Sequence, residues 1–340
     1  MDIICLQTAD PVSYYEMLYE TSKTVRLYCK DNGIHYHCFV GIKRGYFSWH
    51  ASFNRIYMVK EILDSGFRGW ILYVDADAYI ANLKFDLMGY LKDKHGYAMI
   101  LRPGAFTGEF CDVNIGVMLI NASSERAGRV VDQWLSAFLL VPDGVLRSAS
   151  DWDSIPHDQE LFQQILSDNP DLEPYILKDL TQTLHSGPEG GGAAFIEQVI
   201  RAVTGDDEER RRIIRWNVAE ALRSYGHEID PALMASRNEY KLETRKIVTA
   251  LYEGLLGRPP DERQLERHTE AFTRSGLAYV VRDLIAGTDF RSRFVSLNGQ
   301  EQAERSRVQR GATDALGALC RVITDRLGAT LRFGRDRTSS

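Results

Sequence analysis

Apolar residues in the first third of the chain follow two different periods. Residues 3–6 form a short apolar run, and residues 34–42 carry an apolar or aromatic side chain at every second position, which predicts two strands. Residues 13–30 and 52–63 repeat their apolar side chains at helical spacing, and a polar turn with glycine follows each of them. Residues 70–74 are all bulky and predict a buried strand. The alternation of strand and helix predicts an α/β fold with a largely parallel sheet.

Two carboxylates follow the run at residues 70–74. If the strand continues, Asp75 and Asp77 point to the same face and lie about 6–7 Å apart. Their repulsion implies that one holds a proton at neutral pH, unless a metal or a basic group neutralises the pair. Mg²⁺ and Mn²⁺ favour such oxygen ligands, and ligands of parallel sheets bind at the carboxyl ends of strands. The alternative is that the two aspartates only cap a turn.

Two later features of the sequence could belong to a ligand site, namely an interrupted strand and a long loop. Residues 97–101 and 113–121 predict further strands, and Asn114 and Gly116 interrupt the second one. A glycine there marks either the close approach of a ligand or backbone, or a β-bulge, and both readings are open. Residues 141–157 contain proline, glycine, serine and aspartate, and predict a surface loop that suits a lid or an acceptor site.

Composition and charge limit the class of protein. The chain has 340 residues, of which 44% are hydrophobic and 26% charged, so we expect a soluble globular protein of more than one domain. The net charge of −6 argues against general nucleic-acid binding. Five scattered cysteines without a CxxC pair indicate neither a zinc knuckle nor a disulfide framework, which favours a cytoplasmic setting. We expect neither a signal peptide nor a membrane span.

Five segments occur in a family order. They are Arg55 within a predicted helix, followed by ILYVDADAYI, DVNIGVMLIN, HDQELF and LHSGP. The order and spacing of these segments resemble those of the retaining nucleotide-sugar glycosyltransferases, in particular the group with glycogenin-like enzymes and bacterial lipopolysaccharide galactosyltransferases. The resemblance covers roughly residues 1–190. The resemblance implies a GT-A-type fold, a Rossmann-like mixed sheet that is largely parallel and flanked by helices. It also implies metal-dependent transfer of a sugar, a hexose before a pentose, from a UDP-sugar to a hydroxyl of a glycan, lipid-linked or protein acceptor, with retention.

The resemblance assigns roles to individual residues. The expected ligands of Mn²⁺ or Mg²⁺ are Asp75, Asp77 and His185. The residues expected to hold the UDP-sugar are Thr8, Asp10, Tyr14, Arg55, Asp75 and Gly116. The residues expected beside the anomeric carbon are Asn114, Asp158 and Gln159.

Three of these residues have simpler readings outside the resemblance. His185 would then be a surface or structural histidine, and Tyr14 a core residue on a helix face. Arg55 would be a solvated cation on an amphipathic helix.

One family element is missing, and the function therefore has alternatives. The similar enzymes continue from the late histidine into a Lys-Pro-Trp-like element that binds diphosphate, whereas Pro188 is followed here by Glu189 and three glycines. A degenerate transferase fold that serves as a binding or scaffold protein is thus one alternative. A haloacid-dehalogenase-type phosphotransferase is the other, although that family places Asp-x-Asp after its first strand and needs a lysine and an acidic pair that we do not find.

The second half of the chain differs in composition. We expect four regions, which are a GT-A-like domain at 1–192, a helical linker at 193–239, a small helical module at 240–295 and a loosely ordered polar tail at 296–340. Residues 186–192 predict a flexible glycine-rich link. The charged run at residues 206–212 predicts a solvated helix face.

The helical module also carries a resemblance. Leu251-Tyr252, the segment LLGRPPD at residues 255–261 and Asp289-Phe290, expected to close the final helix, resemble the domain of unknown function 4214. Gly257 ending one helix and Pro259 opening the next would be a sufficient structural reason for the middle segment. The resemblance gives no activity, and we expect protein docking for this module.

Overall fold

The chain forms two compact units. A computed structural model describes residues 1–104, 107–149, 151, 154–186, 195–201 and 206–297. The first unit ends at Arg237, and the second begins at Asn238. Residues 187–192 of the predicted link at 186–192, and nearly all of the predicted tail, lie outside the described residues.

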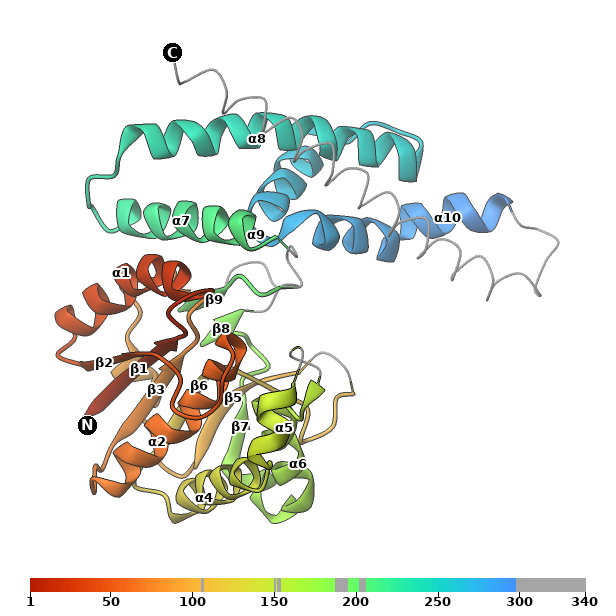
Figure 1. The fold of residues 1–340 in the computed structure, drawn as a ribbon. Helices are drawn as coiled ribbons and strands as arrows, with labels where there is room; N and C mark the ends of the chain where they lie inside the picture. The colour runs from red at the N-terminus through yellow and green to blue at the C-terminus, as the bar shows by residue number, and fades with distance from the viewer. Residues whose placement is uncertain (105–106, 150, 152–153, 187–194, 202–205, 298–340) are drawn as a thin grey trace. The chain divides into compact units, whose positions relative to one another are not determined.

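A six-stranded sheet forms the centre of the first unit, in the order β2-β1-β3-β6-β5-β7 (Figure 1). Its strands are β1 (Ile3–Ala9), β2 (His35–Val40), β3 (Trp70–Val74), β5 (Met99–Pro103), β6 (Val113–Asn121) and β7 (Ile176–Lys178). β1 is parallel to β2 and β3, and β5 is parallel to β7. β6 is antiparallel to both of its neighbours. The sheet is therefore the mixed, largely parallel one that was predicted.

Both faces of this sheet are covered over its central strands, because alternate residues of these strands enter different cores. The edge strand β2 is largely exposed. Tyr73 packs in one core with Val59 and Trp134, whereas Leu72 packs in the other with Val25. Side chains of α2, α4 and α6 fill the first core, and those of α1 fill the second. These helices are α1 (Tyr15–Asp31), α2 (Asn54–Asp64), α4 (Glu125–Leu139) and α6 (Asp158–Asp168). All five side chains of β3 are buried, as its unbroken apolar run predicts.

Strand β6 carries a β-bulge beside β5. Leu101 pairs with Met118, but the next residue, Arg102, pairs with Asn114, so extra residues of β6 are unpaired there. The bulge reading of the interrupted run is thus correct. The carbonyl oxygen of Gly116, within this bulge, accepts from the backbone N–H of Asp75 at 2.8 Å. The bulge therefore lies directly beside the Asp-x-Asp segment.

A second, smaller sheet lies next to that segment. It consists of β4 (Ala78–Ile80), β9 (Ile196–Gln198) and β8 (His185–Ser186), in the order β4-β9-β8. β9 is antiparallel to β4, and Gln198 pairs with Ala78. Helix α7 (Asp207–Ser224) packs on α1 and begins at the cap Asp206. The first unit thus includes β9 and α7, which both follow residue 192 in the sequence.

Short helical turns complete the first unit. They are η1 (Ser48–Phe53), α3 (Leu87–Leu91), α5 (Asp143–Ser148) and η3 (Pro170–Tyr175). The prediction of a plain loop over residues 141–157 was wrong in part, because α5 forms there and buries Leu146 in the core.

The C-terminal helices are α8 (Pro231–Leu251), α9 (Glu262–Ala286) and α10 (Thr288–Leu297). A π-helical turn, η4 (Tyr252–Leu256), ends at Gly257, which has the left-handed φ of 71° that favours glycine. Asp261 caps α9, so Pro259 precedes that helix and does not open it. Asp289 lies in the first turn of α10 and does not close the final helix.

Buried side chains including Tyr252, Phe272 and Val280 form the core of the second unit.

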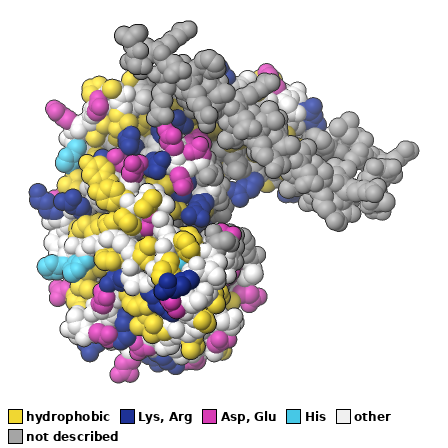
Figure 2. All heavy atoms as spheres, in the orientation of Figure 1, with side chains coloured by type: hydrophobic (Ala, Val, Ile, Leu, Met, Phe, Trp, Pro, Cys, Tyr) yellow, Lys and Arg dark blue, Asp and Glu magenta, His cyan; other side chains and the backbone are white. Residues whose placement is uncertain are grey.

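On the face that Figure 2 shows, acidic and basic side chains are interspersed with apolar ones. None of the described helices is long and apolar enough to cross a membrane.

Candidate active site

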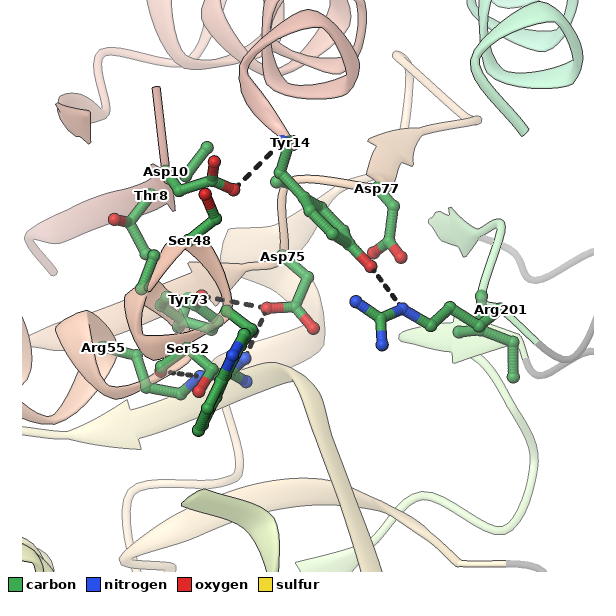
Figure 3. A pocket seen from close by; sticks show the side chains of 15 residues that line it. Thr8, Asp10, Tyr14, Ser48, Ser52, Arg55, Tyr73, Asp75, Asp77 and Arg201 are labelled. Atoms are coloured by element: carbon green, nitrogen blue, oxygen red, sulfur yellow. Dashed lines mark hydrogen bonds and ion pairs between the residues drawn. The ribbon is translucent and has the colours of Figure 1, made fainter. Parts of the chain in front are cut away.

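A cavity of about 320 Å³ opens where β1 and β3 end. This is the edge of a parallel pair at which ligands collect, and the volume is at the lower end of the range of small-molecule sites. Six predicted residues line the cavity (Figure 3): Thr8, Asp10, Tyr14, Arg55, Asp75 and Asp77. Ser48, Ser52, Tyr73 and Arg201 line it as well, and the sequence analysis did not single them out.

The Asp-x-Asp segment forms a turn and does not continue the strand. β3 ends at Val74, and the backbone N–H of Ala78 donates to the carbonyl oxygen of Asp75 at 3.1 Å. The separation expected from strand rise therefore does not apply. The two carboxylates nevertheless converge, because Nε2 of Gln198 donates to Oδ2 of Asp75 at 3.1 Å and to Oδ1 of Asp77 at 2.8 Å.

The Asp75 carboxylate has an arginine and a tyrosine as partners. Its Oδ1 accepts from Nη2 of Arg55 at 2.8 Å and from the Tyr73 hydroxyl at 2.9 Å. Burial raises the pKa of Asp75 to about 7, the Arg55 charge opposes this shift, and the Asp77 charge adds to it. Burial is the main cause of the shift and repulsion by Asp77 a smaller one. The basic group that the sequence analysis allowed for is present, because Arg55 pairs with Asp75.

Asp77 is neutralised by a residue that the sequence analysis missed. Nη2 of Arg210, on α7, lies 2.5 Å from Oδ2 of Asp77. The same guanidinium also donates to the carbonyl oxygen of Val199 and to the Tyr14 hydroxyl, each at 3.1 Å. Arg210 is fully buried, so the prediction of a solvated face for its charged run was wrong at this position. No pattern in the sequence separates Arg210 from the neighbouring arginines.

Arg55 connects the two halves of the predicted site. Besides Asp75, its Nε lies 2.8 Å from Oδ2 of Asp158, and its Nη1 donates to the carbonyl oxygen of Ile115 at 2.8 Å. Its guanidinium also lies over the Tyr73 ring, 4.7 Å from the ring centroid. Arg55 is buried, so the reading of a solvated cation is wrong.

Asp158 and Gln159 begin helix α6 and lie behind Arg55, outside the cavity lining. Burial raises the pKa of Asp158, and the charge of Arg55 opposes this shift. The side-chain oxygen of Gln159 accepts from the backbone N–H of Ile115 at 3.3 Å. Gln159 is therefore held against the bulged strand β6, and Asp158 is held by Arg55.

The residues at the end of β1 shape the cavity wall. The Asp10 carboxylate accepts from the backbone N–H groups of Val12, Ser13 and Tyr14 at 2.6–3.0 Å, and so organises the start of α1. The Thr8 hydroxyl accepts from Asn54 at 2.9 Å. Tyr14 extends from this turn to Arg201, whose Nε donates to the Tyr14 hydroxyl at 3.0 Å (Figure 3).

Gly116 lies in the bulge, Asn114 pairs with Arg102 beside it, and neither residue lines the cavity. Oδ1 of Asn114 accepts from the backbone N–H of Gly116 at 2.9 Å. A Cβ at Gly116 would lie 2.4 Å from Oε1 of Gln198 and 3.0 Å from Oδ2 of Asp75. The neighbours of this glycine are thus two side chains, whereas the second reading named a ligand or another backbone.

His185 is a buried residue of β8, only 1% exposed. Burial lowers its pKa to about 3, Arg102 acts in the same direction, and the Gln198 side chain opposes the shift, so the ring is neutral near pH 7. In the described part of the chain, neither ring nitrogen has a hydrogen-bond partner. Within the same residues, no three His, Cys, Asp or Glu side chains are grouped as a metal site, so His185 is not clustered with Asp75 and Asp77.

The chain is similar to several solved structures at low sequence identity. No protein family model and no curated protein matches the chain. A solved glycosyltransferase involved in the glycosylation of the major capsid of PBCV-1 is 17% identical, over 63% of this chain and 99% of that one, with a TM-score of 0.46. The glycosyltransferase GlyE of Streptococcus pneumoniae TIGR4 is 15% identical, over 53% of this chain and 46% of that one, with a TM-score of 0.33. A Drosophila galactosyltransferase 7 mutant in complex with manganese, UDP-Gal and xylobiose is 12% identical, over 53% and 66% of the two chains, with a TM-score of 0.30.

Proposed function

We propose that this chain is a metal-dependent glycosyltransferase that moves a sugar from a UDP-sugar to a hydroxyl acceptor. The observation that carries the proposal is the cavity at the ends of β1 and β3, where two carboxylates direct one oxygen each to a single point. The order of the five motif segments supports the same assignment. A hexose donor, a glycan, lipid-linked or protein acceptor, and retention of configuration belong to the proposal through that resemblance.

The carboxylate pair fits a hard divalent cation. One oxygen of Asp75 is held by Arg55 and one oxygen of Asp77 by Arg210, so the remaining oxygens are fixed in direction. Such outer partners orient metal ligands, and Mn²⁺ and Mg²⁺ prefer oxygen donors. Asp75 and Asp77 would therefore hold the ion, which as a Lewis acid supplies charge neutralisation for the leaving diphosphate. His185 was predicted as a third ligand, and its neutral ring suits that role as far as protonation is concerned.

Arg201 is our candidate for the missing diphosphate contact. The Lys-Pro-Trp-like element is absent, but Arg201 is exposed and its side chain lines the cavity near Asp77 (Figure 3). A guanidinium binds phosphate oxygens through paired hydrogen bonds, which a lysine does not do. We assign the uracil and ribose to the region of Thr8, Asp10 and Tyr14.

The transfer exchanges one bond for another. The bond from the anomeric carbon to the β-phosphate oxygen breaks, a bond from that carbon to the acceptor oxygen forms, and the acceptor proton passes to a diphosphate oxygen. We assign no covalent nucleophile. Asn114, Asp158 and Gln159 are proposed to act near the anomeric carbon, with Arg55 connecting Asp158 to Asp75.

A thermal-shift screen tests this proposal. Wild-type protein is heated with UDP-, GDP-, ADP- or dTDP-sugars, each with and without Mn²⁺. Binding to the native state raises its stability by about 2.7 kcal/mol at a hundredfold excess over Kd. We expect the largest shift with a UDP-sugar and Mn²⁺ together, and release of UDP when an acceptor is supplied.

Two other outcomes would contradict the proposal. Tight UDP binding that needs no metal and gives no turnover with any acceptor would identify the alternative, a binding protein on a degenerate transferase fold. No shift with any nucleotide would remove the assignment altogether.

For the module at residues 240–295 we propose protein docking. The only support is the resemblance to the domain of unknown function 4214. That resemblance implies no catalytic activity, which leaves a docking role. Deletion of this module should leave UDP-sugar turnover on a small soluble acceptor intact and reduce turnover on a natural macromolecular acceptor. Equal loss on both acceptors would contradict a docking role.

A further inference from the structure

We infer that Gln198, in place of His185, is the third protein ligand of the metal, and that its side-chain amide turns over between the empty and the loaded site. The inference rests on the proposed function, because it concerns the same cation. It adds a residue that lies beyond all of the motif segments and has no counterpart among the predicted ligands.

The amide nitrogen of Gln198 marks the point at which the two carboxylates converge. Its two N–H groups donate to Oδ2 of Asp75 at 3.1 Å and to Oδ1 of Asp77 at 2.8 Å. The other oxygens of these carboxylates are held by Arg55 and Arg210. The amide N–H₂ group thus contacts just those oxygens that a bound cation would need.

The other end of the amide is held less firmly. Oε1 of Gln198 is buried and, within the described residues, makes no hydrogen bond of ordinary geometry, and its neighbour is the His185 ring, whose pKa the Gln198 side chain raises. The oxygen and nitrogen of an amide have nearly the same shape, so a half turn exchanges them without moving the backbone. In the turned state an oxygen would face two carboxylate oxygens, and only a cation between them makes this arrangement favourable.

His185 is placed to support the turned state from behind. It lies on β8, which pairs with the strand that carries Gln198. Its ring is 1% exposed, its nitrogens lack partners among the described residues, and the Gln198 side chain is close enough to influence its pKa. A neutral imidazole can accept from the N–H₂ group that the turn would present to it. His185 would then orient Gln198, as outer residues of metal sites do.

Gly116 leaves room for the amide. A Cβ there would lie 2.4 Å from Oε1 and 2.8 Å from Nε2 of Gln198, which is closer than any stable contact. The pairing of Gln198 with Ala78 in the β4–β9 ladder fixes its backbone opposite the Asp-x-Asp turn. The backbone of Gln198 is therefore fixed, and the glycine leaves the space in which its amide would turn.

Mn²⁺ binding to the full chain, without nucleotide, tests the inference. Affinity is measured by electron paramagnetic resonance titration for the wild type, Gln198→Ala, Gln198→Glu, His185→Ala and the control Gln164→Ala. Gln164 is an exposed glutamine of α6, and its side-chain amide donates to Asp168. We expect a loss of about tenfold or more in Gln198→Ala, no change in Gln164→Ala, and a smaller loss in His185→Ala.

The Gln198→Glu variant guards against simple misfolding. A third carboxylate should lower the melting temperature without metal and raise Mn²⁺ affinity above the wild-type value, because it adds a charged oxygen ligand. Pulsed resonance of the wild-type Mn²⁺ complex should lack coupling to a directly bound imidazole nitrogen.

The outcomes separate this inference from the proposed function. Wild-type Mn²⁺ affinity in Gln198→Ala, or imidazole coupling in the wild type that His185→Ala removes, would overturn the role of Gln198 alone. A wild-type chain that binds no Mn²⁺ would overturn both the inference and the metal dependence of the proposed activity.

Discussion

Arg210 and Asp77 form a buried ion pair, 2.5 Å between Nη2 and Oδ2, across 133 positions of the chain. The pair attaches helix α7 to the Asp-x-Asp turn. Because Arg210 also donates to Tyr14, one guanidinium connects three segments that meet at the cavity. The site therefore depends on residues well beyond the glycine-rich segment.

Removal of Arg210 should destabilise the first unit. Arg210→Met leaves the Asp77 carboxylate without its buried partner, and breaking such a pair typically costs about 3–5 kcal/mol. Urea unfolding measures the change. The double variant with Asp77→Asn should recover part of the loss, because no unpaired buried charge remains.

The exposed pair Arg129–Asp171 provides the control for Arg210. Arg129→Met should change the stability very little, since surface ion pairs contribute little. Additive effects of the Arg210 and Asp77 substitutions in the double-mutant cycle would show that the two side chains do not interact.

Gly116→Ala should impair ligand binding more than folding. The added methyl group would displace the Gln198 amide, which is the movable end of a side chain, while the backbone at Gly116 needs no unusual φ. We expect at least a tenfold loss of Mn²⁺-dependent UDP affinity, with a melting temperature near that of the wild type.

Gly128→Ala, on helix α4, is the matched control because open space surrounds that glycine. It should leave binding unchanged and stabilise the chain by about 0.5–1 kcal/mol through helix propensity. Unchanged UDP affinity in Gly116→Ala would mean that the space beside Gln198 does not matter for the site.

Arg201→Gln should weaken the binding of the diphosphate and spare that of the nucleoside. Calorimetry should show a larger loss of affinity for UDP than for uridine, because only UDP presents the phosphate oxygens that a guanidinium binds. Arg223→Gln, an exposed arginine of α7 that pairs with Glu220, is the control and should bind both as the wild type does. An equal loss for UDP and uridine in Arg201→Gln would exclude a phosphate contact.

A chain that ends at Arg237 should keep the nucleotide site, whereas one that ends at residue 192 should lose it. The first retains Gln198, Arg201 and Arg210 within the compact unit, and the second lacks all three. Mn²⁺-dependent UDP binding by each fragment is the measurement. Full binding by the shorter fragment would show that the residues after 192 are dispensable.

His50 should make the folded state sensitive to acid. Its Nδ1 accepts from the backbone N–H groups of Tyr46 and Phe47 at 2.8 and 3.0 Å, and burial lowers its pKa. The unfolded chain therefore binds a proton as the pH falls below about 6.5, and the folded chain does so only at lower pH. The free energy of unfolding should decrease as the pH falls from 7.5 to 5.5.

His50→Gln should reduce that decrease, as measured by urea unfolding at both pH values. His35→Gln, on the exposed edge strand β2, should leave it as in the wild type. An equal slope in His50→Gln and the wild type would assign the acid sensitivity to other groups.

The sequence alone predicted the elements whose signals are local. The apolar run at residues 70–74 gave strand β3, and the helical spacing at residues 13–30 gave α1, because side-chain period and turn residues act over a few positions. Because the apolar run ends at residue 74, the sequence also predicted that Asp75 and Asp77 lie at the end of a strand. Six of the predicted site residues then line one cavity, because the carboxyl ends of parallel strands share an edge.

Only the tertiary structure decided how the charges at that edge are paired. Gln198 contacts Asp75 across 123 positions, and Arg210 contacts Asp77 across 133. Side-chain periodicity acts over a few positions, so it predicts neither of these contacts. The charged run around Arg210 reads as a solvated face, and only burial against Val199 and Tyr14 makes one of its arginines part of the site. The raised pKa of Asp75 arises in the same way, since the loss of hydration depends on what the folded chain packs around a carboxyl group.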